Sequence, residues 1–288
     1  MTVYWTATKG GTEGNWTDGA NWSSGVAPTA SDDVAFESSG AYAVELTSAV
    51  GVDNIFFDSP SASWFETAAG SFTVTDPAGE LSIVAGYVTL DGANNFANNL
   101  YLDGTGVLEV GNSHALGNSH LYAANGGGEL IGTAAVTLPN AMYFSGGATT
   151  VAAASEPLTI AGTGEVAGDA TLIIGDTTGS LLDGAVVWTG AFENYGFVKI
   201  VAGSMTVDAS GFTNQGIVEG IKRTNPDGSI TFLPDGASSP AFYGGSADNV
   251  FALNAAPYFV DGGDGSDSID VRASMTFSAG SEIGRAHV

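Results

Sequence analysis

LYLDGTG at 100–106, LYAANGG at 121–127 and MYFSGGA at 142–148 follow one another at a constant interval. Each stretch opens with an apolar residue and a tyrosine and then enters a turn of small residues. A chain that winds in coils of about 21 residues would place each residue over its equivalent in the next coil, about 4.8 Å away. We therefore expect a parallel β-solenoid with one apolar column inside and one tyrosine column outside. The inner column would be Leu100, Leu121 and Met142, and the outer column Tyr101, Tyr122 and Tyr143.

Short pairs of apolar residues at alternate positions continue through the rest of the chain. This pattern predicts strands of about three to five residues with one buried face. No segment carries the cap and the 3.6-residue apolar period of a three-turn helix, so the chain is expected to be all-β. LTIAGTG at 158–164 reads as a looser copy of the repeat, and IVAG occurs in both 81–90 and 198–207. An antiparallel sandwich would explain the number of strands but not the constant interval.

Composition agrees with many strands joined by tight turns. The 288 residues include 42 glycines, and 44% are hydrophobic while 13% are charged. Six Lys and Arg stand against 31 Asp and Glu, which gives a formal net charge of −25. Such a surface repels nucleic-acid phosphates and anionic membranes. We therefore expect no nucleic-acid partner, and divalent cations are the natural counterions.

The chain has no cysteine, which excludes disulfides and cysteine zinc sites. No apolar stretch approaches the roughly 18 residues of a membrane-spanning helix, and the N-terminus lacks the pattern of a secretory signal. A cytosolic protein, export by another signal and an incomplete N-terminus all remain open. Residues 283–288, IGRAHV, resemble a translated sequencing adapter, and we give this segment no role.

The nonapeptide GGDGSDSID at 262–270 carries the clearest site chemistry. It fits the pattern G-G-x-G-x-D-x-U-x, in which U is apolar. The glycines permit a tight turn with carbonyl oxygens aimed at one point. Asp267 adds a carboxylate, and together these are the hard oxygen ligands that calcium prefers. The segment resembles the calcium-binding repeats of secreted bacterial RTX proteins.

The resemblance implies a calcium ion between two turns that lie one coil apart, which is two nonapeptides along the chain. A glycine pair at 244–245 precedes the first two glycines of the nonapeptide by this distance, and Asp248 follows it. This upstream turn lacks the third glycine and is one residue short before its aspartate, so complete sites would depend on further coils. An ordinary Asp/Gly turn in an acidic chain is the alternative. The predicted calcium ligands are Gly263, Gly265, Asp267 and Asp248.

A second resemblance covers about 95–170. There a G-x-L-x-V-G strand, an A-L-G turn and a further strand ending in glycines are similar to the autotransporter-associated β-strand repeat of bacterial surface proteins. The resemblance implies a right-handed parallel β-helix that serves as a stalk or passenger. The matching residues are Leu108, Val110, Gly111, Ala115, Leu116, Gly117, Leu121, Gly126 and Gly127.

The tryptophan-rich segment at 14–36 looks like the opening of large bacterial exoproteins that continue as β-helices. Trp16 and Trp22 are expected to cap the open end of the solenoid, because the first coil would otherwise expose apolar surface. An aromatic platform for a sugar is the alternative. Exposed, coplanar rings would support that platform, and buried rings would exclude it.

Catalytic residues are not evident. His114 and His120 have no convincingly spaced third metal ligand, and the few cations that a polysaccharide lyase would need do not cluster. Asp32 and Asp33 are adjacent, but neighbouring strand side chains point to opposite faces, so they do not form the carboxylate pair of a glycoside hydrolase. We predict that the chain is not an enzyme. A carbohydrate-active β-helix enzyme and a lectin-like module are the alternatives.

We expect an N-terminal cap over 1–40, a β-solenoid over 41–235 and the start of a calcium-binding parallel β-roll over 236–282. The predicted function is a structural or adhesive stalk of a secreted or cell-surface bacterial protein. Calcium would assist folding, and surface glycans or neighbouring cells would be the partners. Type I secretion would account for the missing N-terminal signal, because RTX proteins are exported by a C-terminal one.

Overall fold

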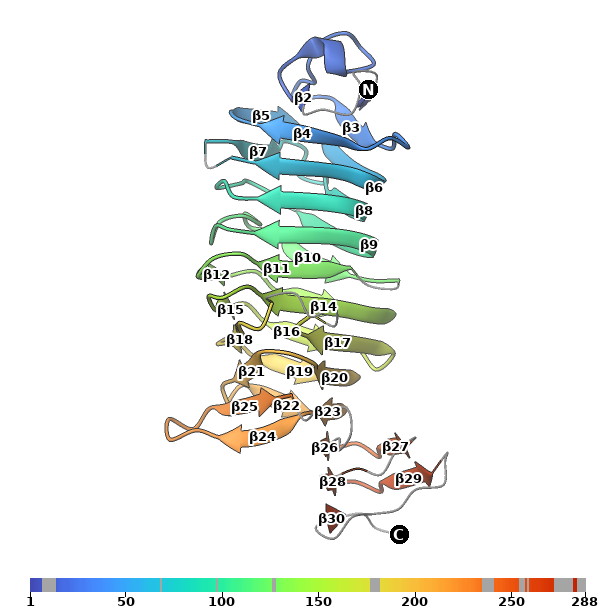
Figure 1. Cartoon of the computed structure of the whole chain (residues 1–288), viewed down its shortest axis with the longest axis vertical. Helices are drawn as coiled ribbons and strands as arrows, with labels where there is room; N and C mark the ends of the chain where they lie inside the picture. The colour runs from blue at the N-terminus through green and yellow to red at the C-terminus, as the bar shows by residue number, and fades with distance from the viewer. Residues whose placement is uncertain are drawn as a thin grey trace.

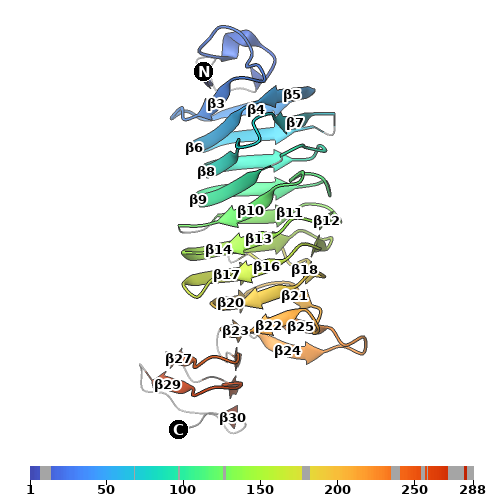
Figure 2. The same cartoon turned by 180° about the vertical axis from the view of Figure 1, so that it is seen from behind.

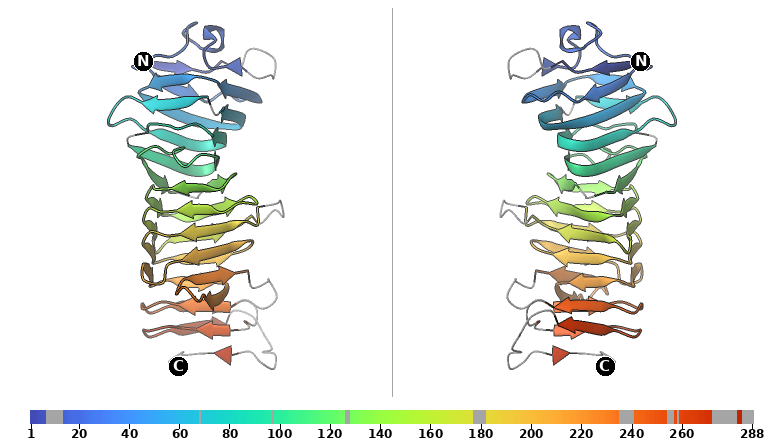
Figure 3. Two further views of the ribbon diagram at one scale, coloured as in Figure 1. Left: turned by 90° about the vertical axis from the view of Figure 1, so that its left-hand side faces the viewer. Right: turned by 90° about the vertical axis from the view of Figure 1, so that its right-hand side faces the viewer.

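The computed structural model describes residues 1–6, 14–67, 69–96, 98–125, 128–176, 182–234, 241–253, 257, 259–271 and 282–283. These residues form an all-β rod of about ten stacked coils (Figure 1). Figures 2 and 3 show the same narrow stack from behind and from its two sides. Strands on the near face of Figure 1 run to the left while the coils descend from the N-terminus, so the winding is right-handed. The predicted parallel β-solenoid is confirmed.

Three runs of strands line the rod. The first is β1 (Thr2–Tyr4), β3 (Asp33–Phe36), the first parts of β6 (Asn54–Glu66), β8 (Leu81–Leu90) and β9 (Asn99–Val110), then β10 (His120–Ala123), β13 (Met142–Phe144), β16 (Gly164–Val166), β19 (Phe192–Asn194) and β22 (Phe212–Asn214). The second is β2 (Gly14–Asn15), β4 (Tyr42–Leu46), the later parts of β6, β8 and β9, then β11 (Glu129–Gly132), β14 (Gly147–Ala153), β17 (Ala170–Ile174), β20 (Phe197–Ile200) and β23 (Ile217–Glu219). The third is β5 (Ala49–Val52), β7 (Ser71–Val74), β12 (Val136–Leu138), β15 (Leu158–Ile160), β18 (Ala185–Trp188) and β21 (Ser204–Val207).

The repeat columns are confirmed. Parallel pairing of β9 with β10 and of β10 with β13 stacks the three apolar residues that open the repeats, and all three are fully buried. On the outer face the ring centroids of Tyr101 and Tyr122 lie 5.7 Å apart, with an interplanar angle of 28°. Those of Tyr122 and Tyr143 lie 4.9 Å apart, at 18°. The constant interval between the repeats is therefore the length of one coil.

Three strands are longer than predicted. β6, β8 and β9 have 13, 10 and 12 residues, because each continues around a corner from the first run into the second. Gly86 turns the backbone at the corner of β8 with a φ of 99°. A Cβ there would lie 2.4 Å from the Ser59 carbonyl oxygen, so the corner requires glycine. In the second copy of IVAG the equivalent Gly203, with a φ of 62°, separates β20 from β21 instead.

The looser copy expected at 158–164 is out of register with the tyrosine column. Met142 pairs with Gly164 of β16, whereas Leu158 belongs to β15 in the third run and lies over Val136. The next coil is longer still, since Gly164 pairs with Phe192. Turns of unequal length absorb these differences, and the strands stay stacked.

The N-terminal end of the rod is closed by aromatic side chains. Trp16 is fully buried and Trp22 is 3% exposed. Their ring centroids lie 4.7 Å apart with the planes at 68°, and Trp22 Nε1 donates to the Trp16 carbonyl oxygen at 2.7 Å. Trp16 also packs edge-on against Phe72 at 5.0 Å. The one helical element among the described residues is a 3-10 turn, Gly19–Asn21, and none of them forms a helix able to cross a bilayer.

The architecture changes after β23. On the third side β21 pairs antiparallel with β25 (Ile230–Leu233), which forms a hairpin with β24 (Ile221–Thr224). On the second side β23 pairs antiparallel with β26 (Ala241–Gly244). Narrower coils follow, in which β26 pairs with β28 (Phe259–Asp261) and β27 (Val250–Leu253) with β29 (Ser268–Val271), both with the same offset along the chain. This is the two-sheet coil expected at the start of a β-roll, and β30 (Glu282–Ile283) pairs with β28.

Candidate functional site

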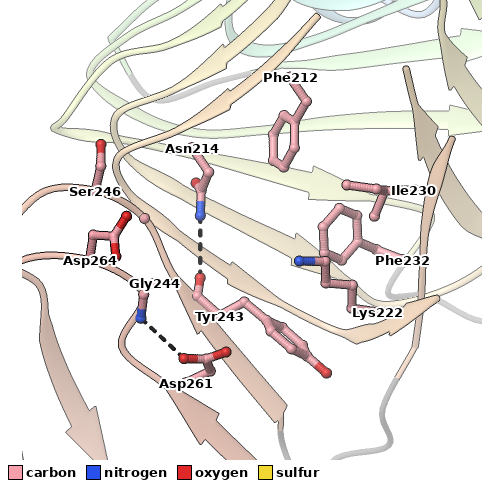
Figure 4. A pocket seen from close by; sticks show the side chains of 12 residues that line it. Phe212, Asn214, Lys222, Ile230, Phe232, Tyr243, Gly244, Ser246, Asp261 and Asp264 are labelled. Carbon is pink, nitrogen blue, oxygen red and sulfur yellow. Dashed lines mark hydrogen bonds between the residues drawn. The ribbon is translucent and has the colours of Figure 1, made fainter. Parts of the chain in front are cut away.

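The candidate site lies where the wide solenoid meets the narrow roll. The β24–β25 hairpin leaves the stack on one side and β26 starts the roll on another, so an open cleft of about 440 Å³ forms between them (Figure 4). It is lined by Phe212, Asn214, Lys222, Ile230, Phe232, Tyr243, Gly244, Gly245, Ser246, Asp261, Gly263 and Asp264.

One wall of the cleft is aromatic. The ring centroids of Phe212 and Phe232 lie 5.9 Å apart, and those of Phe232 and Tyr243 lie 6.4 Å apart. One coil earlier, Phe192 stacks on Phe212 and is 1% exposed. Phe212 and Tyr243 are only partly buried, although the next coil places the Phe259 ring 5.3 Å from the Tyr243 ring. Asn214 holds β26 in place through a long hydrogen bond, 3.5 Å, from Nδ2 to the Tyr243 carbonyl oxygen (Figure 4).

Charged groups of both signs lie beside these rings, since Asp261 pairs with Tyr243 and Lys222 pairs with Phe232. Asp261 ends β28 and accepts a hydrogen bond from the Gly263 backbone N–H at 3.2 Å, and Asp264 is exposed in the following turn. The Lys222 ammonium lies 5.8 Å from the centre of the Tyr243 ring, a cation–π arrangement. Its side chain reaches into the cleft in Figure 4. The cleft therefore offers aromatic faces, oxygen acceptors and one ammonium donor.

The predicted calcium ligands lie in the turns beside the cleft, and the register changes how they pair. The pairing of β27 with β29 places Asp267 over Asn249 rather than over Asp248. The Asn249 backbone N–H donates to Asp267 Oδ1 at 2.9 Å, and the Ser266 N–H donates to Asp248 Oδ1 at 2.7 Å. Asp267 is 6% exposed and Asn249 is 7% exposed, whereas Asp248 is exposed to solvent. The two predicted carboxylates therefore do not converge.

The upstream turn at 244–252 has the length of the nonapeptide but carries its aspartate one residue earlier, as the sequence indicated. Ala247 stands at the position of Gly265, and Asn249 at the position of Asp267. Gly265 has a φ of 113°, and a Cβ there would lie 2.8 Å from the Ala247 carbonyl oxygen. Gly263 has a φ of 80°, and its Cβ would approach a carbonyl oxygen of the coil above to 2.3 Å. Close stacking of the coils thus explains both glycines without a bound ion.

The two described turns supply fewer carboxylates than two full nonapeptides would. Calcium takes about six to eight oxygen ligands, and here the amide of Asn249 stands where the nonapeptide pattern has its aspartate. Within the described ranges no group of three or more His, Cys, Asp and Glu could hold a metal ion. Asn249 instead ties the coils together, since its Oδ1 accepts from the Gly245 N–H at 2.9 Å and its Nδ2 donates to the Gln215 carbonyl oxygen at 3.0 Å.

The structure also corrects the alternative in which Trp16 and Trp22 form a platform for a sugar. Both side chains are buried in the cap, and the rings meet edge to face rather than lying coplanar. Neither ring offers a face to solvent.

Acidic side chains elsewhere are spread along the rod. Glu66 is 2% exposed, and this burial raises the pKa of its carboxyl group. Burial, followed by the charges of Asp176 and Glu109, raises the pKa of Glu129. Tyr87 also has a raised pKa, first from burial and then from its hydrogen bond to Glu109. These groups lie on the solenoid coils, away from the cleft.

Sequence reasoning misses the cleft, because its residues come from separate strands that only the reversal at β24–β26 brings together. One signal is nevertheless present in the sequence. Residues 10–198 contain no Lys or Arg, and Lys222 and Arg223 then stand beside the turn-rich NPDGS at 225–229. The predicted matches Gly126 and Gly127 lie outside the described residues, as does most of the segment 283–288.

Comparison of the chain with protein-family models, with curated proteins and with solved structures finds no match.

Proposed function

We propose that the chain is a non-catalytic extracellular stalk, a rigid spacer that carries an adhesive or presenting surface of a bacterial protein. The observation that supports this most is the continuous axial stacking. One apolar core extends from Val3 in the first coil to Phe232 at the hairpin. Such a stack lengthens by about 4.8 Å per coil and each coil contacts mainly its neighbours, which suits a spacer whose length is set by the number of coils.

The surface agrees with an extracellular spacer. A net charge of −25 keeps separate rods apart and soluble by mutual repulsion. The resemblances to autotransporter-associated repeats and to RTX repeats favour a secreted or cell-surface location, and the narrow coils at the C-terminal end agree with the second of them. The stalk proposal does not depend on calcium, because the stack is held by the apolar core of the solenoid coils.

Location is tested by antibodies raised against the purified chain and applied to cells of the source organism. We expect labelling of intact cells, or recovery of the protein from the medium, without permeabilisation. Labelling that appears only after the cells are permeabilised would contradict the proposal. An antibody against a cytosolic protein of the same cells serves as the control for leakage.

The absence of catalysis is tested separately. The purified chain is incubated with neutral and uronate-containing polysaccharides, and reducing ends and unsaturated uronates are measured over time. We expect neither to rise above a heat-denatured control. A rise that is lost on substitution of Asp261 or Asp264 would replace the stalk by a carbohydrate-active enzyme.

A further inference from the structure

We infer that the cleft between β22, the β24–β25 hairpin and β26 binds a neutral saccharide, with one sugar ring against the aromatic wall. The inference rests on the proposed function for its biological setting, since it supplies the adhesive surface with a ligand class. Saccharide binding is measured on the purified chain, so this test does not depend on where in the cell the protein is located.

The aromatic wall is exposed for a topological reason. Further up the rod each ring in this stack is covered by the next coil, as Phe192 is by Phe212. At the junction the hairpin and β26 diverge, and Phe212 and Tyr243 stay partly exposed and line the cleft, although Phe259 packs on Tyr243 from the following coil. A sugar ring has an apolar C–H face that stacks on aromatic faces, and stacking there removes apolar surface from water.

The charged groups select against other ligand classes. An anionic ligand such as a nucleotide would meet Asp261 and Asp264 and a chain of net charge −25. A cationic ligand would be attracted by Asp261 and Asp264, but it would have to displace the Lys222 ammonium from its position over the Tyr243 ring. A wholly apolar ligand would desolvate the carboxylates without a hydrogen bond in return. An uncharged polyol avoids all three costs.

The same groups can recognise hydroxyls. Carboxylates accept hydrogen bonds, an ammonium donates them, and the Ser246 hydroxyl does both. The volume, about 440 Å³, lies within the range of about 300–1,000 Å³ that is usual for small-ligand pockets. Because the cleft is open to solvent, a longer glycan can extend out of it.

Binding is tested by saturation-transfer NMR and calorimetry, with glucose, galactose, N-acetylglucosamine and glucuronic acid as probes. We expect at least one neutral sugar to bind with a Kd of about 1 mM, and its oligomers more tightly. Glucuronic acid should bind more weakly than glucose, because its carboxylate meets Asp261 and Asp264. A preference for glucuronic acid would overturn the neutral-ligand inference, as would failure of every neutral probe to saturate.

Two variants locate the site. Asp264→Asn changes an exposed turn residue and should weaken binding by about fivefold, the size of one lost hydrogen bond. Tyr243→Ala removes the stacking face and should abolish measurable binding, with a near-UV spectrum to show that the variant is folded. Tyr87→Ala, which removes an exposed tyrosine on β8, should bind as the wild type does. Unchanged affinity in Asp264→Asn and in folded Tyr243→Ala would overturn the assignment of the site.

The two proposals fail separately. Binding without cleavage supports both. Binding with cleavage would keep the saccharide site and end the non-catalytic stalk. Surface labelling without saccharide binding would keep the stalk and end the inference about the cleft.

Discussion

Glu66 is a buried acidic residue whose ionisation is expected to destabilise the folded rod. It ends β6 and is 2% exposed. Its Oε2 accepts hydrogen bonds from the Gly92 N–H at 2.8 Å and from Asn94 Nδ2 at 3.0 Å, while its Oε1 is buried without a partner. Burial raises the pKa of this carboxyl above its ordinary value of 4.5. The folded state therefore binds a proton here more tightly than the unfolded state does.

The sign of the pH dependence follows from linkage. A group with a raised folded-state pKa contributes stability that is present below the unfolded pKa and is lost as pH rises through the folded pKa. We expect Glu66→Gln to remove this decline, because the amide keeps an acceptor oxygen without a charge. At neutral pH the variant should be more stable than the wild type by about 1 kcal/mol, a usual size for one site. Urea denaturation from pH 4 to pH 8 measures it.

Glu37→Gln is the matched control, since Glu37 is exposed one residue after β3. Its unfolding free energy should follow that of the wild type at every pH. If Glu66→Gln kept the decline with pH, or were less stable at neutral pH, the buried carboxylate would not be the destabilising group.

The buried Trp16 side chain is expected to stabilise the N-terminal cap. The indole is fully buried and contacts the rings of Trp22, Phe36, Trp64 and Phe72. We expect Trp16→Ala to lower the unfolding free energy by about 3–5 kcal/mol, as for large-to-small changes in other cores. Trp16→Phe should lose less, because most of the packing area is kept. Equal losses in both variants, in guanidinium titrations followed by circular dichroism, would contradict the capping role.

Individual residues also mark the limit of prediction from sequence. The burial of Trp16 follows from a simple need, because an open coil end has apolar surface to cover. The partner of Asp267 could not be predicted in the same way. Whether Asp248 or Asn249 lies over it depends on one residue in a turn, and a shift by one residue exchanges the buried and exposed faces. The pattern therefore identified the turn but not that Asn249, rather than Asp248, lies over Asp267.

At the scale of strands and turns, the repeat predicts stacking only where the coils are equal in length. From β9 through β10 to β13 the interval stays constant, and the tyrosine column follows. From β16 to β19 the turns lengthen, and no periodic signal remains in the sequence. The length of strands β6, β8 and β9 was not predicted for another reason. A glycine at a corner, such as Gly86 in β8, indicates a turn in the sequence although the backbone continues as a strand.

The turn that contains Asn249 gives a prediction about the roll. Asn249→Asp would place a second buried carboxylate over Asp267 and would remove the hydrogen bond to Gln215. We expect the coils at 241–271 to lose about 1–3 kcal/mol at neutral pH, the cost of a buried unpaired group. Added calcium should restore the stability of the variant, because the cation would offset the repulsion between its two buried carboxylates. The stability of the wild type should not change.

Hydrogen exchange of the amides at 241–271 measures this effect locally. Magnesium at the same ionic strength is the control for screening. If calcium slowed amide exchange equally in the wild type and in the variant, the native turns would already form a calcium site.

At the scale of the whole molecule, the stack follows from the repeat and the cleft does not. Axial stacking is a property of each coil and its neighbour, so three copies of the repeat suffice to predict it. The cleft requires β24, β25 and β26 to reverse direction together, which brings Phe212, Lys222 and Asp264 to one place. No local pattern encodes a meeting of segments that are separated by a change of architecture.

The stalk proposal makes a prediction about length. Leu121 and Met142 hold equivalent positions in adjacent coils, so a second copy of residues 121–141 inserted before Met142 should form one more coil. Each copy would keep the apolar column inside and the tyrosine column outside. We expect the rod to lengthen by about 4.8 Å per copy, so that four copies add about 19 Å to the maximum dimension in small-angle X-ray scattering. Stability should not fall, because each new coil buries its own apolar face against two neighbours.

A copy of residues 121–140 is the control, since it differs by one residue. It would shift the strand that follows each copy by one residue, with that strand's tyrosine inside and its apolar residue outside. Unless a turn absorbs the missing residue, these chains should melt at a lower temperature and should not lengthen in proportion to the number of copies. If both series lengthened and melted alike, the interval between the repeats would not control the stacking. If neither lengthened, the coils would not be the independent units on which a spacer depends.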